Sequence, residues 1–408
     1  MNPMETLEEY LARRASADTP LGAMLRLPIE ERRRLGVEHT AREILQQPWT
    51  WRQTARLVLG EQAEAVRRLL GCGAITDLVL AGAGSSAYAG LALVPLFRQV
   101  CGWAADAVPT TDLLLEARGA FLPGQRQPAR SLLVSMARSG DSPESTGVVD
   151  RLLRELPEVR HLILCCNGQG ALAQRYRDRP NVCTLVLPEA ANDQSLMMTS
   201  SFSSLIVAGQ CVAALAAAAE RQYEAVVETM CAAGECLLDA AAVAKELAEP
   251  VPDRVCLLAS RALMGVAREG ALKLLESTAG RVAALPETFL GFRHGPMAFA
   301  GQRTILLFFL SSDESTRPYE LDLLREARAK GLGRKSVALG PGAEGVEADV
   351  RLSAPYAAPL PDCYRAPVDV IFPQMLAFFS CLQLGLQPDA PSAAGVIHRV
   401  VQGVRVYG

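Results

Sequence analysis

The sequence predicts an α/β protein with two similar parallel sheets, each flanked by helices as an αβα sandwich. Short apolar runs rich in β-branched residues alternate with helical segments, which is typical of a parallel sheet covered on both faces. In the first half, loops rich in glycine and serine follow two such runs, at Gly82 and Ser139. The same order of elements returns about 175 residues later, where Leu258 matches Leu80. This repeat indicates a duplicated domain.

The elements divide the chain into four consecutive parts. Residues 1–50 have a helical pattern broken at Pro20 and Pro28, which predicts a helical N-terminal extension. The first sheet domain is expected over 51–220 and the second over 221–385, and a tail over 386–408 is expected to close over the site. Expected strands span 77–81, 131–136, 162–166, 184–187, 254–260, 304–310 and 335–339, and a last helix spans 368–384.

Composition excludes several classes of protein. The 408 residues are half apolar, with a net charge of -3 and a pI near 6.0, which argues against a nucleic-acid surface. Residues 1–14 lack the apolar core of a signal peptide, and the most apolar run, 205–219, is short for a membrane span. The 11 cysteines form no C-x-x-C pair, and the 4 histidines are not at ligand spacing. We therefore expect a cytoplasmic protein with no metal, no membrane partner and free thiols.

One helical stretch carries the strongest candidates for proton chemistry. At helical spacing Glu269, Lys273 and Glu276 share one narrow stripe, while most other positions of this helix except Arg268 are apolar and expected to be buried. Buried charges are tolerated only when paired or put to use. Together with His294 before a Gly-Pro turn, the stripe could move protons. It could equally be an ion-pair ladder that pins the helix to its neighbours.

The two loops of the first half are candidate phosphate sites. Each of the segments 82–86 and 139–145 follows a strand and opens a helix, so backbone N–H groups and hydroxyls converge where an anion is stabilised. Two other interpretations remain open. Gly82-x-Gly84-x-x-Ala87 with Asp106 fits a dinucleotide fingerprint, and serines and glycines also serve as plain helix caps. A further polar stretch, 192–204, is either a loop over the ligand or a solvated turn.

These motifs together resemble a known family. The two loops and the duplicated layout resemble the sugar isomerase (SIS) domain, and 269–276 with His294 resembles the isomerase half of glucosamine-6-phosphate synthase. Longer motifs are similar to the AgaS-type tagatose-6-phosphate ketose/aldose isomerases and galactosamine-6-phosphate deaminases. They read A-R-S-G-D-S-P-E-S, N-D-Q-S-x-x-M-T-S-S-F, G-F-R-H-G-P, P-D-x-P-S and R-V-V-Q-G-V.

The resemblance implies two tandem flavodoxin-like SIS domains and a role for each motif. Glu276 would carry a proton between C2 and C1, His294 would help to open the sugar ring, and Glu269 and Lys273 would support them. The residues implied to bind phosphate or substrate are Gly84, Ser85, Ser86, Arg138, Ser139, Gly140, Ser142, Ser200, Ser201 and Gln402. Two positions depart from the synthase: Ala137 replaces a phosphate-contacting serine, and Gln402 replaces a lysine of the tail.

The resemblance also implies a reaction and a partner. The expected activity converts galactosamine 6-phosphate to tagatose 6-phosphate and ammonia by an aldose-ketose proton shuttle, with no cofactor. A ketose/aldose isomerase without deamination and a non-catalytic sugar-phosphate sensor are the alternatives. In the synthase the histidine that matches His294 reaches the active site of the other subunit, so a homodimer is expected to be the catalytic unit.

Overall fold

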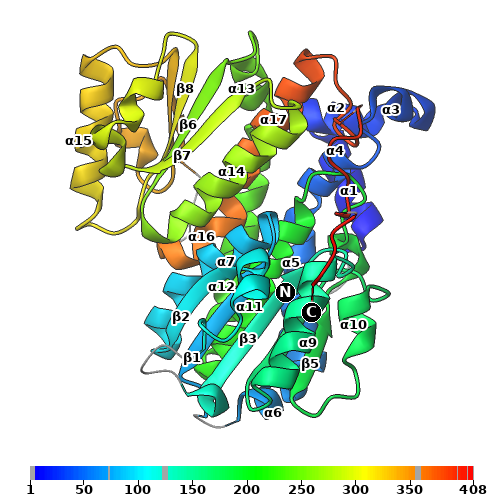
Figure 1. Cartoon of the computed structure of the whole chain (residues 1–408). Coiled ribbons are helices and arrows are strands. Elements are labelled where there is room, and N and C mark those ends of the chain that lie inside the picture. Colours follow the sequence, from blue (N-terminus) through cyan, green and yellow to red (C-terminus); the bar gives the residue numbers. More distant parts are fainter. Residues whose placement is uncertain are drawn as a thin grey trace. The chain divides into compact units, whose positions relative to one another are not determined.

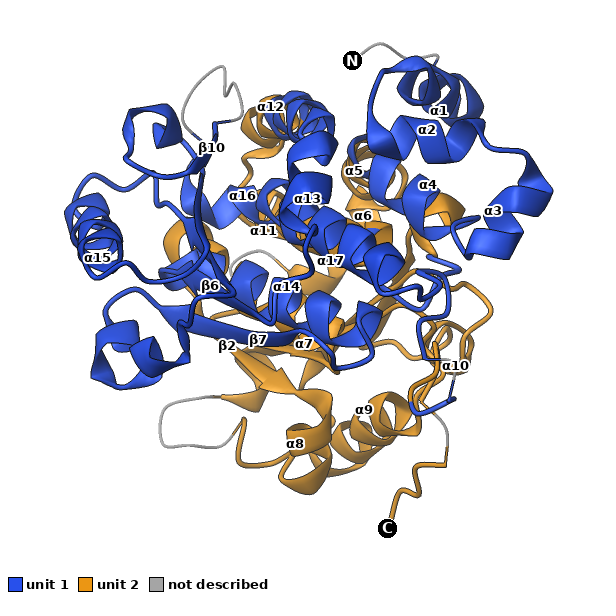
Figure 2. Cartoon of the chain, turned by 90° about the horizontal axis from the view of Figure 1, so that it is seen from above, with its two compact units in different colours: residues 1–49, 193–199, 228–396 blue, residues 50–192, 200–227, 397–408 orange. Residues whose placement is uncertain are grey.

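The computed structural model describes residues 5–71, 74–121, 127–353, 360–392, 394–401 and 403–407. They form two compact units, which Figure 2 shows in different colours. Unit 1 comprises residues 1–49, 193–199 and 228–396, and unit 2 comprises residues 50–192, 200–227 and 397–408. Two helices have residues in both units: α5 (Gln47–Arg56) and α12 (Glu220–Asp239).

Unit 2 is built on a parallel sheet in the order β2-β1-β3-β4-β5. Its strands are β1 (Asp77–Gly82), β2 (Ala104–Pro109), β3 (Ser131–Ala137), β4 (Arg160–Cys165) and β5 (Val182–Val186). Its helices are α6 (Ala63–Leu70), α7 (Ser85–Leu96), α8 (Thr110–Leu115), α9 (Pro143–Glu155), α10 (Ala171–Arg175) and α11 (Ser200–Ala216). Every residue of β1 and β3 is buried, as expected for central strands covered on both faces.

Unit 1 contains the second parallel sheet, in the order β10-β9-β8-β6-β7. Its strands are β6 (Arg254–Ala259), β7 (Ala283–Thr288), β8 (Thr304–Phe309), β9 (Lys335–Leu339) and β10 (Val350–Leu352). The N-terminal helices are α1 (Leu7–Ser16), α2 (Pro20–Arg26), α3 (Ile29–Leu35) and α4 (Thr40–Leu45). The remaining helices are α13 (Ala241–Leu247), α14 (Met264–Ser277), α15 (Arg317–Ala329), α16 (Asp362–Asp369) and α17 (Ile371–Gln383).

The predicted fold class is confirmed. Read from β7 to β10, the second sheet has the same strand order as the first, so the repeat seen in the sequence is a repeat of topology. All seven expected strands are present, with ends within two residues of the expected ones. The strands β2, β7 and β10 were not expected. Each is an edge strand; β2 and β7 contain proline, and β10 has only 3 residues, so none shows the apolar run of a central strand.

One helical segment of the described chain is long and apolar enough to cross a membrane. It spans Asp362–Gln383, and 89% of its most apolar window is buried inside the protein. A Cβ on Gly270 of α14 would lie 2.8 Å from Cβ of Pro373 in this segment, so glycine lets the two helices approach closely. The segment therefore has the packing of a core helix.

Helices α14 and α15 cover opposite faces of the second sheet (Figure 1). Cys256 and Leu258 of β6 belong to an apolar cluster with Leu323 and Leu324 of α15. Leu257 points the other way, because a Cβ on Gly270 of α14 would lie 2.7 Å from its Cδ2. Side chains alternate between the two faces of a strand. The strand side chains that contact α14 therefore lie on one face of the sheet, and those that contact α15 lie on the other.

The N-terminal helices hold the polar loop 193–199 through a buried carboxyl group. Glu43 of α4 is 4% exposed and accepts hydrogen bonds from the backbone N of Gln194 and from Oγ of Ser195, both at 2.5 Å. The loop also contacts α14, where Oγ of Ser277 donates to Sδ of Met197 at 3.2 Å. Burial, followed by the negative charge of Asp193, raises the pKa of Glu43 from 4.5 to about 8.

The raised pKa predicts how the stability of unit 1 depends on pH. Between pH 4.5 and 8 the native state keeps a proton on Glu43 that the unfolded state has released, so the free energy of unfolding falls as pH rises. We expect Glu43→Gln to weaken this fall, because glutamine keeps the shape and cannot ionise. Thermal unfolding followed by circular dichroism between pH 5 and 8.5 measures it.

The exposed Glu8 provides the matched control, since Glu8→Gln should follow the wild type at every pH. If Glu43→Gln and the wild type lose stability in parallel up to pH 8.5, the native carboxyl is already ionised and the interpretation is wrong.

Candidate functional site

Three charged side chains of α14 form one continuous ion-paired stripe. Nζ of Lys273 lies 2.5 Å from Oε2 of Glu276 and 3.4 Å from Oε1 of Glu269. The side chains of Glu269 and Lys273 are 0% and 1% exposed, whereas that of Glu276 is 23% exposed. The ladder expected from the spacing is therefore present. Of its three members, Glu276 is the one that a dissolved molecule can reach.

The rest of α14 is more exposed than the sequence indicated. The helix was expected to be buried almost all round apart from Arg268, but Leu275 is 49% exposed. This side chain lies in the last turn, beside Glu276, whereas Leu274 and Ser277 of the same turn are buried. One side of this turn is therefore exposed, and that side carries the accessible carboxylate.

His294 lies on the other side of the second sheet from Glu276. It ends the short turn η6 (Gly291–His294), is exposed, and has no hydrogen bond or ion pair in the described part of the chain. Phe292 of this turn belongs to the apolar cluster on the α15 face. Nε of Arg293 lies 2.6 Å from Oε2 of Glu326 in α15. One copy of unit 1 therefore does not bring His294 and Glu276 together.

The two serine loops of unit 2 lie next to each other. They follow β1 and β3, which are parallel neighbours in the sheet. Helix α7 begins at Ser85, and both Ser85 and Ser86 are 4% exposed. Gly84 has φ 54° and ψ -126°, a conformation that favours glycine. No side chain caps α7 or α9, so no carboxylate of the described residues occupies either helix start, although the N–H groups of Ser86 and Ser145 donate to nearby backbone carbonyls.

Polar contacts brace the loop that contains Ser139 and Ser142. The side-chain amide of Asn167 donates to the backbone O of Ser139 at 3.1 Å, and the N of Ala171 donates to Oδ1 of Asp141 at 2.9 Å. Ser142 occupies the N-cap position of α9, as expected, but its Oγ lies 2.7 Å from Oγ of Ser145 instead of capping the helix. Gly140 has φ 73°.

The tail of unit 2 passes beside this loop. Nη2 of Arg138 donates to the backbone O of Arg399 at 2.6 Å, and Arg399 in turn donates to Oδ1 of Asn192 at 2.9 Å. A Cβ on Gly147 of α9 would lie 3.3 Å from Cγ1 of Val406. Arg138 therefore anchors the tail, a role that the sequence did not indicate. Gln402 lies outside the described residues.

The remaining predicted binding residues open helix α11. Ser200 and Ser201 are fully buried at its start. In the same turn Oγ of Ser203 accepts a hydrogen bond from Nε1 of Trp51 at 2.8 Å. Polar side chains at the start of α11 thus serve as hydrogen-bond partners for buried groups of the protein.

The matching loop of the second sheet is already filled by carboxylates of the protein. After β8, the backbone N of Ser311 donates to Oε2 of Glu320 at 2.7 Å. The N and Oγ of Ser312 donate to Oδ1 of Asp362 at 2.8 and 2.9 Å. Internal carboxylates thus occupy the donors that an anion would need in this loop, whereas no side chain caps the helices that follow the unit 2 loops.

Sequence reasoning missed three acidic side chains that hold these loops, those of Glu43, Asp362 and Glu320. Glu43 and Asp362 are far in the sequence from the loops that they bind, and no local motif marks them. Asp389 was noticed only as part of the tail motif; its carboxylate accepts from the N and Oγ of Thr40 at 2.7 and 2.6 Å. The segment around Glu43 reads T-A-R-E-I-L-Q, and nothing in this mixed pattern marks a buried carboxyl group.

Known proteins resemble the chain over nearly its whole length, although no family model matches it. The AgaS protein of Streptomyces coelicolor is 38% identical over 399 residues, 95% of this chain and 98% of the relative. The D-galactosamine-6-phosphate deaminase AgaS of Shewanella sp. (strain ANA-3) is 32% identical over 392 residues, 94% and 95% of the two chains.

A solved structure agrees with these relatives. The tagatose-6-phosphate ketose/aldose isomerase from Escherichia coli has a TM-score of 0.79 and is 30% identical; the match covers 90% of this chain and 96% of that one. Relatives carry the names of deaminases and of ketose/aldose isomerases, and the chain is an enzyme of this sugar-phosphate class. With 38% identity across both sheets and both sets of motifs, the chain belongs to the AgaS family of sugar isomerase domain proteins.

Proposed function

We propose that the protein converts galactosamine 6-phosphate and water to tagatose 6-phosphate and ammonia. The observation that carries the proposal is the stripe on α14, where buried Lys273 holds the accessible carboxylate of Glu276 at 2.5 Å. The D-galactosamine-6-phosphate deaminase among the relatives supports the choice of sugar. The serines of the unit 2 loops hold the phosphate, which anchors the carbon chain and orients it for reaction.

The proposed chemistry transfers protons and breaks one C–N bond. After the ring opens, Glu276 takes the proton from C2, a double bond forms between C1 and C2, and the aldehyde oxygen on C1 takes up a proton, which gives an enolamine. Return of the first proton to C1 and loss of a proton from the nitrogen leave a ketimine at C2. Water adds to this carbon and ammonia leaves, giving the ketose phosphate. Lys273 positions the carboxylate through their ion pair, and Glu269 compensates the buried ammonium charge.

His294 is proposed to act in the site of a second copy of the chain. Within one copy it stands on the α15 face of the second sheet, whereas Glu276 stands on the α14 face. A histidine with acid/base work must come within hydrogen-bond reach of the substrate. We infer a homo-oligomer in which each site combines Glu276 of one subunit with His294 of another.

Ammonia release tests the reaction and its base together. We expect release from galactosamine 6-phosphate in preference to glucosamine 6-phosphate, and a fall in kcat of about 10²- to 10⁴-fold in Glu276→Gln, because glutamine cannot accept the proton. If neither sugar yields ammonia, the deaminase assignment is wrong; formation of tagatose 6-phosphate from galactose 6-phosphate would then establish a plain isomerase.

Phosphate anchoring predicts a change in KM. Ser142→Ala should raise KM for the sugar phosphate about tenfold, the cost of one hydrogen bond to a charged group, with a smaller effect on kcat. Initial-rate kinetics measure both. The matched control is Ser312→Ala in the corresponding loop of unit 1, which should leave KM unchanged because Asp362 already occupies that loop. Equal effects of the two substitutions would contradict the assignment.

Mixing two inactive variants tests the shared histidine. Glu276→Gln and His294→Ala, unfolded and refolded together, should recover about a quarter of the wild-type activity, since half of random dimers are mixed and each has one intact site. Each variant refolded alone is the control. Activity no higher than in these controls would show that both groups act within one subunit.

A further inference from the structure

Two acidic side chains are buried at the loop 193–199 of unit 1. One is Glu43 of α4 and the other is Asp193, the first residue of the loop. Each binds the loop through its carboxyl group, and the negative charge of Asp193 acts on Glu43. The proposed reaction uses neither of them. Two neighbouring carboxylates that are both ionised and buried would repel each other, so we expect this pair to keep a proton.

The hydrogen bonds of Ser195 indicate which side chain holds the proton. Its Oγ lies 2.5 Å from Oε2 of Glu43 and 3.0 Å from the backbone O of Met197. A hydroxyl has one hydrogen to donate, so Ser195 cannot donate to both oxygens at once. If Glu43 is the neutral acid, it donates to Ser195, and Ser195 donates to Met197. Ionisation of Glu43 would take the donor of Ser195 away from one of the two oxygens.

Asp193 is placed to carry the negative charge of the pair. Its Oδ2 accepts from the backbone N of Thr199 at 2.7 Å, and its Oδ1 lies 3.4 Å from Oγ of the same threonine. Donors of this kind stabilise a carboxylate. Burial and this neighbouring charge raise the pKa of Glu43 from 4.5 to about 8. The hydrogen bonds and the raised pKa thus both assign the proton to Glu43.

The other elements packed against α4 supply little compensating charge. Helix α17 has no charged side chain. Arg14 of α1 pairs with Asp239 at 2.8 Å, and Arg26 of α2 donates to the backbone O of Ala17 at 3.0 Å. Arg42, which precedes Glu43 in α4, is exposed. Further titratable groups on these elements and at the start of α4 include Tyr10, His39, Cys381 and Asp389.

The loop connects Glu43 to the helix that carries the accessible carboxylate. Sδ of Met197 accepts a hydrogen bond from Oγ of Ser277, the last residue of α14, at 3.2 Å. Both side chains are 1% exposed. Ser277 directly follows Glu276 in the chain. A change in the position of Met197 therefore changes the packing of the turn that presents Glu276.

We propose that Glu43 is a positioning residue whose proton holds the loop 193–199 against α14, so that loss of this proton shifts Met197 and lowers the activity at alkaline pH. Ionised Glu43 and Asp193 would repel each other within the protein. The N of Leu196 still donates to the backbone O of Asp389 at 3.0 Å, which limits the movement to a loosening of the loop. The effect on activity rests on the proposed role of Glu276, whereas the movement of the loop does not.

Hydrogen exchange of the full chain tests the movement without any substrate. The N–H groups of Gln194 and Ser195 should be protected at pH 6.5 in peptides that cover 193–199. After correction for the intrinsic pH dependence of exchange, this protection should fall about tenfold per pH unit above pH 8, the linkage expected for one proton. Glu43→Gln should keep it, because glutamine offers one acceptor and one donor as the neutral acid does. Protection that does not change with pH in the wild type overturns the proposal, whatever the reaction.

The pH dependence of kcat/KM tests the effect on activity. The wild type should lose activity through an alkaline limb near pH 8, and Glu43→Gln should keep its rate through this limb. Asp193→Asn should move the limb about one unit to lower pH, because removal of the neighbouring negative charge makes Glu43 easier to ionise. A purely structural role of Glu43 would instead lower the rate equally at every pH.

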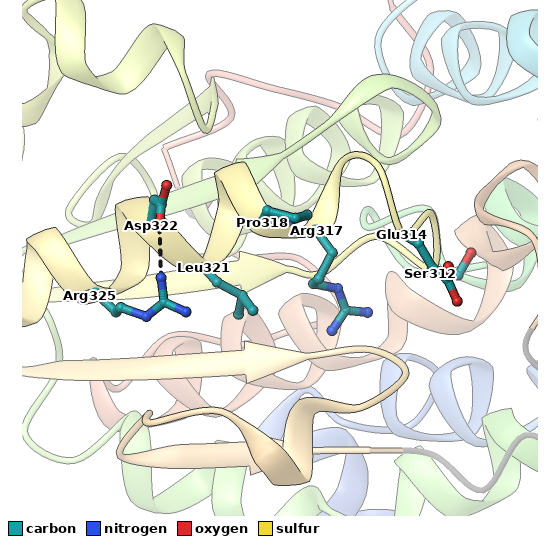
Figure 3. Close-up of a pocket in the computed structure, with 7 residues that line it drawn as sticks. All are labelled: Ser312, Glu314, Arg317, Pro318, Leu321, Asp322 and Arg325. Atoms are coloured by element: carbon teal, nitrogen blue, oxygen red, sulfur yellow. Dashed lines mark hydrogen bonds and ion pairs between the residues drawn. The ribbon is translucent and has the colours of Figure 1, made fainter.

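A carboxylate elsewhere in unit 1 provides the matched control. Asp322 of α15 lines a groove of about 390 Å³ and pairs with Arg325 at 2.7 Å (Figure 3). Asp322→Asn removes one negative charge, as Asp193→Asn does, but from an exposed ion pair outside the loop. It should follow the wild type in both measurements.

The variants distinguish the possible outcomes. If Glu43→Gln does not fold, Asp193→Asn answers the same question, since its loop should lose protection about one pH unit lower than that of the wild type. An alkaline limb at the same pH in every variant belongs to the substrate or to other groups and overturns the proposal. Loss of loop protection without any change in the rate profile overturns it as well, because the loop would then not act on Glu276.

Discussion

The buried ammonium of Lys273 is the interaction on which the candidate active site depends. It is 1% exposed and pairs with two carboxylates of the same helix, one fully buried and one open to solvent. Removing one partner of a buried pair typically costs about 3–5 kcal/mol, because the other charge is left uncompensated. The stripe therefore fixes the rotamers of all three side chains, and it presents Glu276 in one defined position at the end of α14.

The duplicated fold shows how two copies of one topology can diverge. Both sheets end in a serine loop at the same switch point, but the donors of the second loop are bound by Glu320 and Asp362. In the first sheet, α7 and α9 follow the corresponding loops, and no side chain caps the start of either helix. A carboxylate carries the charge and the acceptor oxygens that a phosphate would offer, so one internal residue is enough to close an anion site.

Distant segments of unit 1 meet through backbone hydrogen bonds to carboxylates. Asp389 binds the start of α4, and the backbone O of Asp389 accepts from the N of Leu196 in the polar loop. Glu43 of α4 binds the same loop, and Met197 of that loop contacts the last residue of α14. The N-terminal extension is thus part of the support of α14, which explains why a helical segment outside both sheets is built into the same unit.

Periodicity and motif spacing alone determined the fold class, the repeat, the central strands and the charged stripe of α14, because these depend on local propensity and on a spacing within one element. The edge strands were missed, since half-buried strands with proline carry little apolar signal. Only the tertiary structure decided which member of the stripe is accessible, that the sheet separates His294 from Glu276, and that Glu43 and Asp362 bind loops far from them in sequence. Burial and long-range pairing set these properties, and neither leaves a mark in the spacing of residues along the chain.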